Sequence, residues 1–152
     1  MSTPTPPATD LYLVVGYDGS PPASRALDTA VRLLRGRTGR IEVTYVANLS
    51  STVMLSAGAV AEMEISFDEI EQELRGTAAE QLRGHDVGWG FIRRQGPIAV
   101  ELIAVAEGVR DAHPGDVVVI VVGSSSEAIH HVIGSAAVSL ARHSPVPLII
   151  VP

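Results

Sequence analysis

The run VVVIVV at Val117–Val122 is apolar at every position and consists entirely of β-branched residues. Such side chains favour strands, and a strand that is apolar on both faces has to be covered on both faces. Strands of this kind lie inside parallel sheets whose two faces carry helices. The run therefore predicts an α/β fold in which Val117–Val122 is a central strand.

Strand patterns and helix patterns alternate on both sides of this run. Their β-rich composition predicts further strands at Leu11–Tyr17, Ile41–Ala47, Asp86–Gln95 and Leu148–Val151. Helices are expected where apolar residues recur at spacings of three and four. They are predicted from Ser20-Pro21 to Leu34, along a long stretch ending near Leu82, from Gly96-Pro97 to His113, and over Ser135–His143.

The two middle helices are each expected to bury one face. The long one follows a loop over Asn48 to about Ala59, and six acidic residues in its first half indicate a solvated face. Its apolar stripe comprises Met63, Phe67, Ile70, Leu74, Ala78 and Leu82. In the next helix the residues expected to face inward are Val100, Ile103, Ala104 and Val109.

Five strands that alternate with four helices predict right-handed parallel crossovers. The expected fold is α/β: a Rossmann-like, doubly wound five-stranded parallel sheet in the order 3-2-1-4-5 with helices on both faces. Ligands in such sheets bind beyond the carboxyl ends of the strands, where the strand order reverses. That point lies between the first and fourth strands, which end in Asp18-Gly19-Ser20 and Gly123-Ser124-Ser125-Ser126. The two turns are expected to converge on one crevice.

The segment Gly123–Ser135 has the features of an anion-binding loop. Gly123 lets the chain leave the strand without a Cβ, and Gly134 does the same beside the helix start, so backbone N–H groups can face a phosphate. The Ser135 hydroxyl and the free N–H groups of Ala136 and Ala137 would complete the site. The alternative is that Ser135 only caps its helix and that the serines only solvate a loop.

Composition and charge exclude several classes of protein. The chain has 152 residues, a usual length for one domain, which we assign to residues 11–152. It has no cysteine, and all eleven basic residues are arginine, so it has no lysine. Disulfide scaffolds, cysteine-based metal sites, P-loop lysines and Schiff-base lysines are therefore excluded. A net charge of −6 argues against nucleic-acid binding.

The remaining features predict a soluble, cytoplasmic protein that neither binds nor enters membranes. Met1–Asp10 lacks the charged and apolar regions of an export signal and is interpreted as a disordered tail. The longest apolar run, Val117–Val122, is too short to span a bilayer.

The adjacent His130 and His131 would point in different directions on a helix and are poorly placed to share a metal ion. No G-x-S-x-G motif occurs, and neither catalytic nor metal-binding residues are predicted.

Two stretches resemble the universal stress protein family. They read LVVGYDGSPPASRALDTAVRLL, from Leu13 to Leu34, and VVVIVVGSSSEAIHHVIGSAAVSLARHSPVPLIIVP, from Val117 to Pro152. The V-x-x-D-G-S turn, the V-V-G-S strand exit and the closing R-H-S-P-V-P run carry the resemblance, which covers essentially the whole chain after the tail. It implies a cytoplasmic, homodimeric, five-stranded α/β protein of the stress response, in a family some of whose members bind ATP.

The resemblance also implies roles for individual residues. In the ATP-binding members the phosphate loop reads G-x2-G-x9-G-[ST]. By position, Asp18 would face ribose or adenine, Val46 would line the adenine, and Gly123, Gly134 and Ser135 would contact phosphates; Gly16, Ser126 and Ala136 complete the predicted cofactor-binding set. Ser126 stands where the family has its second glycine, and the spacer Glu127–Ile133 has seven residues rather than nine.

These observations leave more than one function open. The favoured interpretation is a dimeric binding and regulatory module of the stress response with a weak site for ATP or another adenine nucleotide, and with Mg²⁺ only when the nucleotide is bound. One alternative is an ATP-binding member that hydrolyses ATP slowly. Another is a nucleotide-independent interaction protein with a vestigial crevice. Asp18, Gly134 and Ser135 favour nucleotide binding, whereas Ser126 favours the interaction protein.

The last predicted strand indicates how two copies would pair. In the order 3-2-1-4-5, Leu148–Val151 is an edge of the sheet, and all four of its residues are apolar. An apolar edge with unpaired backbone groups has to be covered. Pro147 and Pro152 bracket the run, which favours a closed two-fold homodimer in which the two strands lie antiparallel. The alternative is a monomer whose C-terminus tucks under its own fourth helix.

Overall fold

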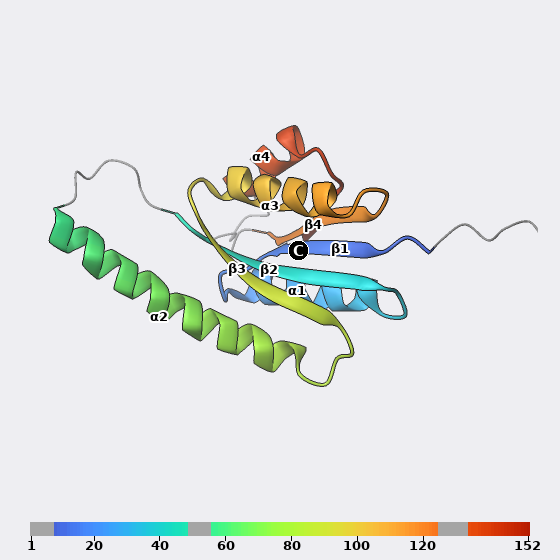
Figure 1. Ribbon diagram of the computed structural model, residues 1–152, viewed down its shortest axis with the longest axis horizontal. Helices are drawn as coiled ribbons and strands as arrows, with labels where there is room; N and C mark the ends of the chain where they lie inside the picture. The colour runs from blue at the N-terminus through green and yellow to red at the C-terminus, as the bar shows by residue number, and fades with distance from the viewer. Residues whose placement is uncertain (1–7, 49–55, 125–133) are drawn as a thin grey trace, which may run out of the picture.

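The computed structural model describes residues 8–48, 56–124 and 134–152, in which strands and helices alternate along the chain (Figure 1). The strands are β1 (Leu11–Gly16), β2 (Gly39–Ala47), β3 (Gly88–Gln95), β4 (Val117–Gly123) and β5 (Leu148–Val151). The helices are α1 (Pro21–Leu34), α2 (Ala57–Leu82), α3 (Ile98–Ala112) and α4 (Ser135–His143).

The five strands form one parallel sheet in the order β3-β2-β1-β4-β5. Leu13 of β1 lies opposite Ile41 of β2 on one side and Val119 of β4 on the other. The predicted fold class and strand order are confirmed, and the strand order reverses between β1 and β4. The carboxyl ends of both strands therefore meet at one point of the sheet edge.

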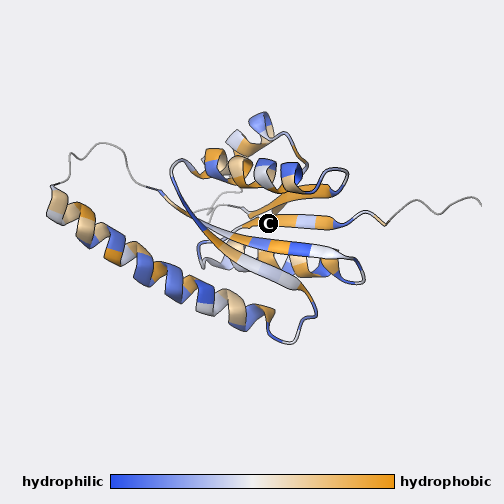
Figure 2. Cartoon of the chain, in the orientation of Figure 1, coloured by the Kyte–Doolittle hydropathy of each residue, from blue (hydrophilic) through white to orange (hydrophobic). Residues whose placement is uncertain are grey.

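Helices cover both faces of the sheet, and the core forms two clusters (Figures 1 and 2). One cluster joins α1 and the end of α2 to side chains such as Leu13 and Val121. The other joins α3 and α4 to side chains such as Val14 and Ile120. In β4 the five residues from Val118 to Val122 are buried, but Val117 is 45% exposed because the strand begins at the rim of the sheet.

The start of α1 follows the local sequence. Ser20 is the N-cap, its hydroxyl oxygen accepts a hydrogen bond from the Ala23 N–H, and Pro21 is the first helical residue. After α1, the chain enters β2 at Gly39. This residue has a φ of +142°, and a Cβ there would overlap the carbonyl oxygen of Leu11. Gly39 thus opens β2 beside β1, two residues before the expected start of that strand at Ile41.

The predicted stripe of α2 is only half buried. Leu74, Ala78 and Leu82 are its buried residues, whereas Met63 and Phe67 are half-buried and lie outside both core clusters. In Figure 1 the N-terminal half of α2 diverges from the sheet. Ile70 of the same stripe is partly buried and packs against the first cluster, so the predicted apolar face is confirmed, with burial that decreases towards the N-terminus of the helix.

In α3 the expected inward face is confirmed in part, because Ile103 and Val109 are partly buried and pack against the second cluster. Ala99, Leu102, Val105 and Ala106 are buried, while Val100, expected inside, is 57% exposed.

Residues 1–7 of the predicted tail lie outside the described residues, and the backbone N–H of Asp10 donates to Asp116 at 3.1 Å. Within the described ranges, no helix has the length and apolarity to cross a membrane.

Candidate functional site

A cavity of about 280 Å³ lies where the carboxyl ends of β1, β2 and β4 meet the first turns of α1, α3 and α4. It lies at the predicted reversal point of the sheet. Of the predicted site residues, seven line it: Gly16, Asp18, Val46, Gly123, Gly134, Ser135 and Ala136. Ser126, His130 and His131 lie outside the described residues.

The β1 exit is a tight turn that presents Asp18 at the surface. One carboxylate oxygen of Asp18 accepts a hydrogen bond from the Ser20 N–H at 3.0 Å, which closes the turn. Gly19 has a φ of +77°, and a Cβ there would lie 2.7 Å from Cδ2 of Leu74 in α2. The turn is therefore fixed by its own hydrogen bond and by the packing of α2 over it.

The β4 exit passes directly over the start of α1. A Cβ on Gly123 would overlap the backbone carbonyl of Pro22, so only glycine fits at this crossing. The next residue, Ser124, donates its N–H to the carbonyl oxygen of Val151 at 2.7 Å. Gly123 therefore has a packing requirement of its own, which is independent of any ligand.

The start of α4 provides hydrogen-bond donors on the cavity wall. Gly134 is the N-cap, with no side-chain hydrogen bond, and Ser135 is the first helical residue. The alternative in which Ser135 caps the helix is therefore wrong. The N–H groups of Ser135, Ala136 and Ala137 have no carbonyl partner within the helix, because they belong to its first turn. Together with the helix dipole they favour an anion at this end of the cavity.

Another part of the cavity wall is apolar. It is formed by the side chains of Val46, Ile98, Leu102, Val122 and Leu140. Thr44 also lines the cavity; it is fully buried, and its hydroxyl donates to the carbonyl oxygen of Glu42 at 3.3 Å. Burial raises the pKa of the Tyr17 phenol, and the carboxylates of Asp18 and Asp28 raise it further. The Tyr17 hydroxyl therefore stays protonated at neutral pH.

Among the described lining residues, Asp18 has the only charged side chain. A ligand with an apolar ring, hydroxyl groups and an anionic end would find a counterpart for each part: the apolar lining, the Asp18 carboxylate and the N–H groups of α4. An adenine nucleotide has these three parts. The residues present thus fit a nucleotide without a basic side chain, with backbone N–H groups as the anion donors.

Sequence reasoning missed several lining residues, notably Thr44, Ile98 and Leu102. A signal for the last two was present, since they lie four residues apart at the start of a helix that follows a strand. Residues at that spacing share a helix face, and the start of such a helix points to the carboxyl edge of the sheet. Thr44 had a weaker signal, as a polar residue near the end of an apolar strand.

Comparison with known proteins agrees with the fold. The model of the universal stress protein family matches residues 13–152. No curated protein sequence matches the chain significantly. Among solved structures, hypothetical protein MJ0577, whose biochemical function was assigned from its structure, superposes with a TM-score of 0.76 at 15% identity, over 95% of this chain and 96% of its own.

Two further neighbours were solved with nucleotides. A universal stress protein in complex with cAMP has a TM-score of 0.62 and 20% identity, over 95% of this chain and 98% of its own. A universal stress protein family protein from Arabidopsis thaliana with AMP bound has a TM-score of 0.60 and 15% identity, over 93% of this chain and 90% of its own. At these identities the likeness shows a shared fold.

Proposed function

The chain belongs to the universal stress protein family, and on that premise we propose that it is a binding and regulatory module of the stress response with a weak adenine-nucleotide site. The observation that carries the proposal is the meeting of the Asp18 turn and the first turn of α4 in one cavity. The cAMP and AMP complexes of two structural neighbours support the choice of an adenine nucleotide.

In the proposed complex each part of the cavity has one task. The N–H groups of Ser135 and Ala136 bind a phosphate at the start of α4. The Asp18 carboxylate accepts hydrogen bonds from the ribose hydroxyls. Val46 and the apolar lining around Leu102 cover the base, with Gly16 and Gly123 allowing close approach of the backbone. Mg²⁺ would enter only with the nucleotide and would lie against its phosphates.

Two features make the proposed site weak. Ser126 replaces a glycine of the family's phosphate loop, and the spacer before Gly134 is two residues shorter than the family pattern. A side chain and a tighter loop both limit the approach of backbone N–H groups to a triphosphate. We therefore expect a dissociation constant between about 10 µM and 1 mM, equivalent to roughly −7 to −4 kcal/mol.

A second candidate, an interaction protein that needs no nucleotide, is favoured by two contacts. Gly123 is required by its crossing with Pro22, and Asp18 closes its own turn through Ser20, so both residues have roles without a ligand. A third candidate is an ATP-binding member that hydrolyses ATP slowly.

We further propose a cytoplasmic location and a homodimer formed through β5, both in line with the family resemblance.

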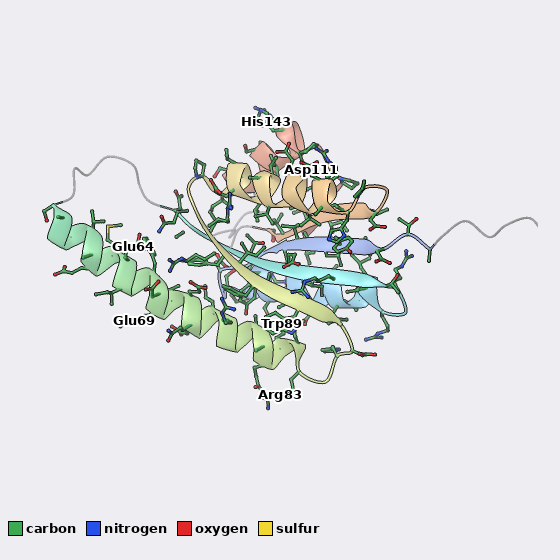
Figure 3. The ribbon with its side chains drawn as sticks, in the orientation of Figure 1. Glu64, Glu69, Arg83, Trp89, Asp111 and His143 are labelled. Atoms are coloured by element: carbon green, nitrogen blue, oxygen red, sulfur yellow. The ribbon has the colours of Figure 1, made fainter. Side chains whose placement is uncertain are left out.

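Calorimetric titration with ATP, AMP and cAMP tests the nucleotide proposal. Asp18→Asn should weaken binding by about tenfold, roughly 1.4 kcal/mol, because it removes the charge that strengthens the ribose hydrogen bonds. Ser135→Asp should abolish binding, because it places a negative charge where the phosphate lies. Asp111→Asn is the matched control: Asp111 lies near the end of α3 (Figure 3), its side chain is 77% exposed, and it is not among the residues that line the cavity.

The outcomes separate the three candidates. Binding that Asp18→Asn leaves unchanged would overturn the proposed position of the ligand. Absence of binding to all three nucleotides at millimolar concentration would favour the nucleotide-independent interaction protein. Release of phosphate from bound ATP, lost in Ser135→Asp, would favour the hydrolysing member.

A further inference from the structure

One wall of the cavity is supported from outside by α2. The segment Asp18–Ala23 forms this wall, since Asp18, Ser20, Pro22 and Ala23 all line the cavity. None of the described lining residues belongs to α2. The helix α1 and the C-terminal half of α2 nevertheless lie on the same side of the sheet, where both pack into the first cluster (Figure 1). The helix α2 can therefore affect a bound ligand through the wall residues that it supports.

The first point of support is the contact of Leu74 with the Asp18 turn. Leu74 is 9% exposed and belongs to the first cluster. A Cβ on Gly19 would lie 2.7 Å from Cδ2 of Leu74, so this side chain reaches the backbone of the turn. Across the same turn, the Asp18 carboxylate accepts the hydrogen bond from the Ser20 N–H at 3.0 Å. Leu74 thus limits how far the turn, and with it the Asp18 carboxylate, can move.

The second point of support is a set of side-chain hydrogen bonds between Gln81 and α1. The amide nitrogen of Gln81 donates to the carbonyl oxygen of Ser24 and to a carboxylate oxygen of Asp28, both at 2.7 Å. The Ser24 hydroxyl donates in turn to the amide oxygen of Gln81 at 3.0 Å. Since Ser24 directly follows Ala23 in the wall, Gln81 holds the first turn of α1 in place. Leu74 and Gln81 are seven residues, or about two helical turns, apart and therefore share one face of α2.

We propose that Leu74 and Gln81 are positioning residues of the nucleotide site, so that the docking of α2 determines how tightly the site binds. This inference rests on the proposed function, because it needs a ligand that contacts Asp18. A wall that is already ordered binds a ligand more tightly than a mobile one, because less conformational entropy is lost on binding. Leu74 orders the carboxylate that binds the ribose, and Gln81 orders the start of α1. The contacts of α2 thereby contribute to affinity without touching the ligand.

Calorimetric titration with AMP measures the contribution of Leu74. Leu74→Ala should weaken AMP binding about three- to tenfold, the range expected when one turn has to be ordered on binding. Leu34→Ala is the matched control, because Leu34 is a buried leucine of the same cluster but lies about 18 Å along α1 from Pro22. Both variants should lose stability in urea, whereas only Leu74→Ala should lose affinity.

Two further measurements show whether Leu74 acts through Asp18. In the Asp18→Asn background, where the charged contact with the ribose is already lost, Leu74→Ala should weaken AMP binding less than about twofold, because the two positions are coupled. In the protein without ligand, the NMR signal of the Ser20 amide reports the hydrogen bond to Asp18. That signal should shift in Leu74→Ala and stay in place in Leu34→Ala.

Gln81 is tested in the same titration. Gln81→Ala removes the hydrogen bonds to Ser24 and Asp28 and should weaken AMP binding about threefold, because the start of α1 is then less ordered. Gln72→Ala is the matched control: Gln72 is an exposed glutamine of the same helix, and its removal should leave the affinity unchanged.

Four results would overturn this inference and leave the proposed function standing. They are equal AMP affinities of Leu74→Ala and Leu34→Ala, the same loss from Leu74→Ala with and without Asp18→Asn, an unshifted Ser20 signal, and an unchanged affinity of Gln81→Ala. A parent that binds none of ATP, AMP and cAMP would overturn the proposed function, and this inference with it. Should Leu74→Ala fail to fold, Leu74→Val, whose side chain is one carbon shorter than leucine, replaces it in every comparison.

Discussion

At Gly123 the end of β4 crosses the start of α1 too closely for any side chain. Gly123→Ala should therefore destabilise the protein by about 1–3 kcal/mol, the usual cost of forcing extra atoms into a packed site. Gly108→Ala is the matched control, since Gly108 lies within α3 and a Cβ there meets nothing within 4 Å. That change should stabilise by up to about 1 kcal/mol, because alanine favours helices.

Urea unfolding followed by the fluorescence of Trp89, the single tryptophan, measures both variants. If Gly123→Ala were as stable as the parent, the crossing with Pro22 would have room to relax, and the packing role of Gly123 would be refuted. A phosphate-binding role alone predicts a loss of nucleotide affinity with no loss of stability.

Tyr17 makes stability depend on pH in the alkaline range. Burial raises the pKa of its phenol above the ordinary value of 10.0, and Asp18 and Asp28 add to the shift. Below pH 10 the phenol is protonated in both folded and unfolded chains. Above pH 10 the unfolded chain ionises first, so unfolding releases a proton and the free energy of unfolding falls as pH rises.

Urea unfolding between pH 8.5 and 11.5 tests this dependence. Tyr17→Phe should make the fall in stability shallower, because phenylalanine has no proton to release. Burial also raises the pKa of Tyr45, so part of the fall should persist in that variant. An identical slope in parent and Tyr17→Phe would show that the Tyr17 phenol ionises equally in both states.

Among the elements, α2 is attached by a packed C-terminal half and an ion-paired N-terminal half. Arg93→Ala removes the ion pairs of Arg93 in β3 with Glu64, Asp68 and Glu71 and should increase amide hydrogen exchange over residues 57–73 of α2. The global free energy of unfolding should fall by no more than about 1–2 kcal/mol, because Glu64 and Asp68 are at least half exposed, while Arg93 and Glu71 are 23% exposed. Arg83→Ala, which removes the exposed pair with Glu80, should leave exchange in that half unchanged. Faster exchange throughout the sheet would instead show that Arg93 supports the core.

The bounds of the elements could be predicted where local chemistry sets them. The Ser20-Pro21 start of α1, the helix Ser135–His143 and the strand Leu148–Val151 agree with the sequence prediction, because caps and breakers mark their ends. Burial was less predictable. Periodicity identified the apolar face of α2, but how deeply Met63 and Phe67 are buried depends on how closely the N-terminal half of the helix approaches the sheet, which a single helix pattern does not contain.

The candidate site was predictable to the extent that topology determines it. Parallel strands bring their carboxyl ends to one edge, so the meeting of Asp18 with Ser135 at one cavity follows from the strand order. The apolar lining was missed, because Ile98 and Leu102 reach the cavity only through the docking angle of α3. That angle depends on core packing: it buries Leu102 and leaves Val100, which the sequence pattern placed inside, exposed.

In the intact protein, β5 needs a cover along its outer edge. β5 is an edge strand, and all four of its residues are half-buried. The carbonyl group of Pro147 accepts a hydrogen bond from the N–H of Ile120 in β4 at 3.0 Å, and that of Val151 accepts one from Ser124, just after β4, at 2.7 Å. Because backbone groups alternate sides along a strand, those of Leu148 and Ile150 point outward. An antiparallel second copy would pair with them.

Ile150→Pro tests this homodimer, because it removes an outward N–H and keeps the hydrogen bonds to β4. Light scattering should give about 32 kDa, twice 16.0 kDa, for the parent and about 16 kDa for the variant. Ile149→Pro removes an inward N–H and should lower the melting temperature instead. A parent mass near 16 kDa would exclude the dimer, and a dimeric Ile150→Pro would place the interface elsewhere.

The sheet separates the core into two clusters whose residues alternate along β1 and β4. Leu27 fills one cluster and Leu102 the other, so truncations at these two positions have no shared partner within a cluster. Their costs should add to within about 0.5 kcal/mol, whereas Leu13 and Leu27, which share a cluster, should couple. During evolution, substitutions on the α1 side and on the α3 side can therefore be accepted independently of each other. Only the strands between the two clusters are constrained by both.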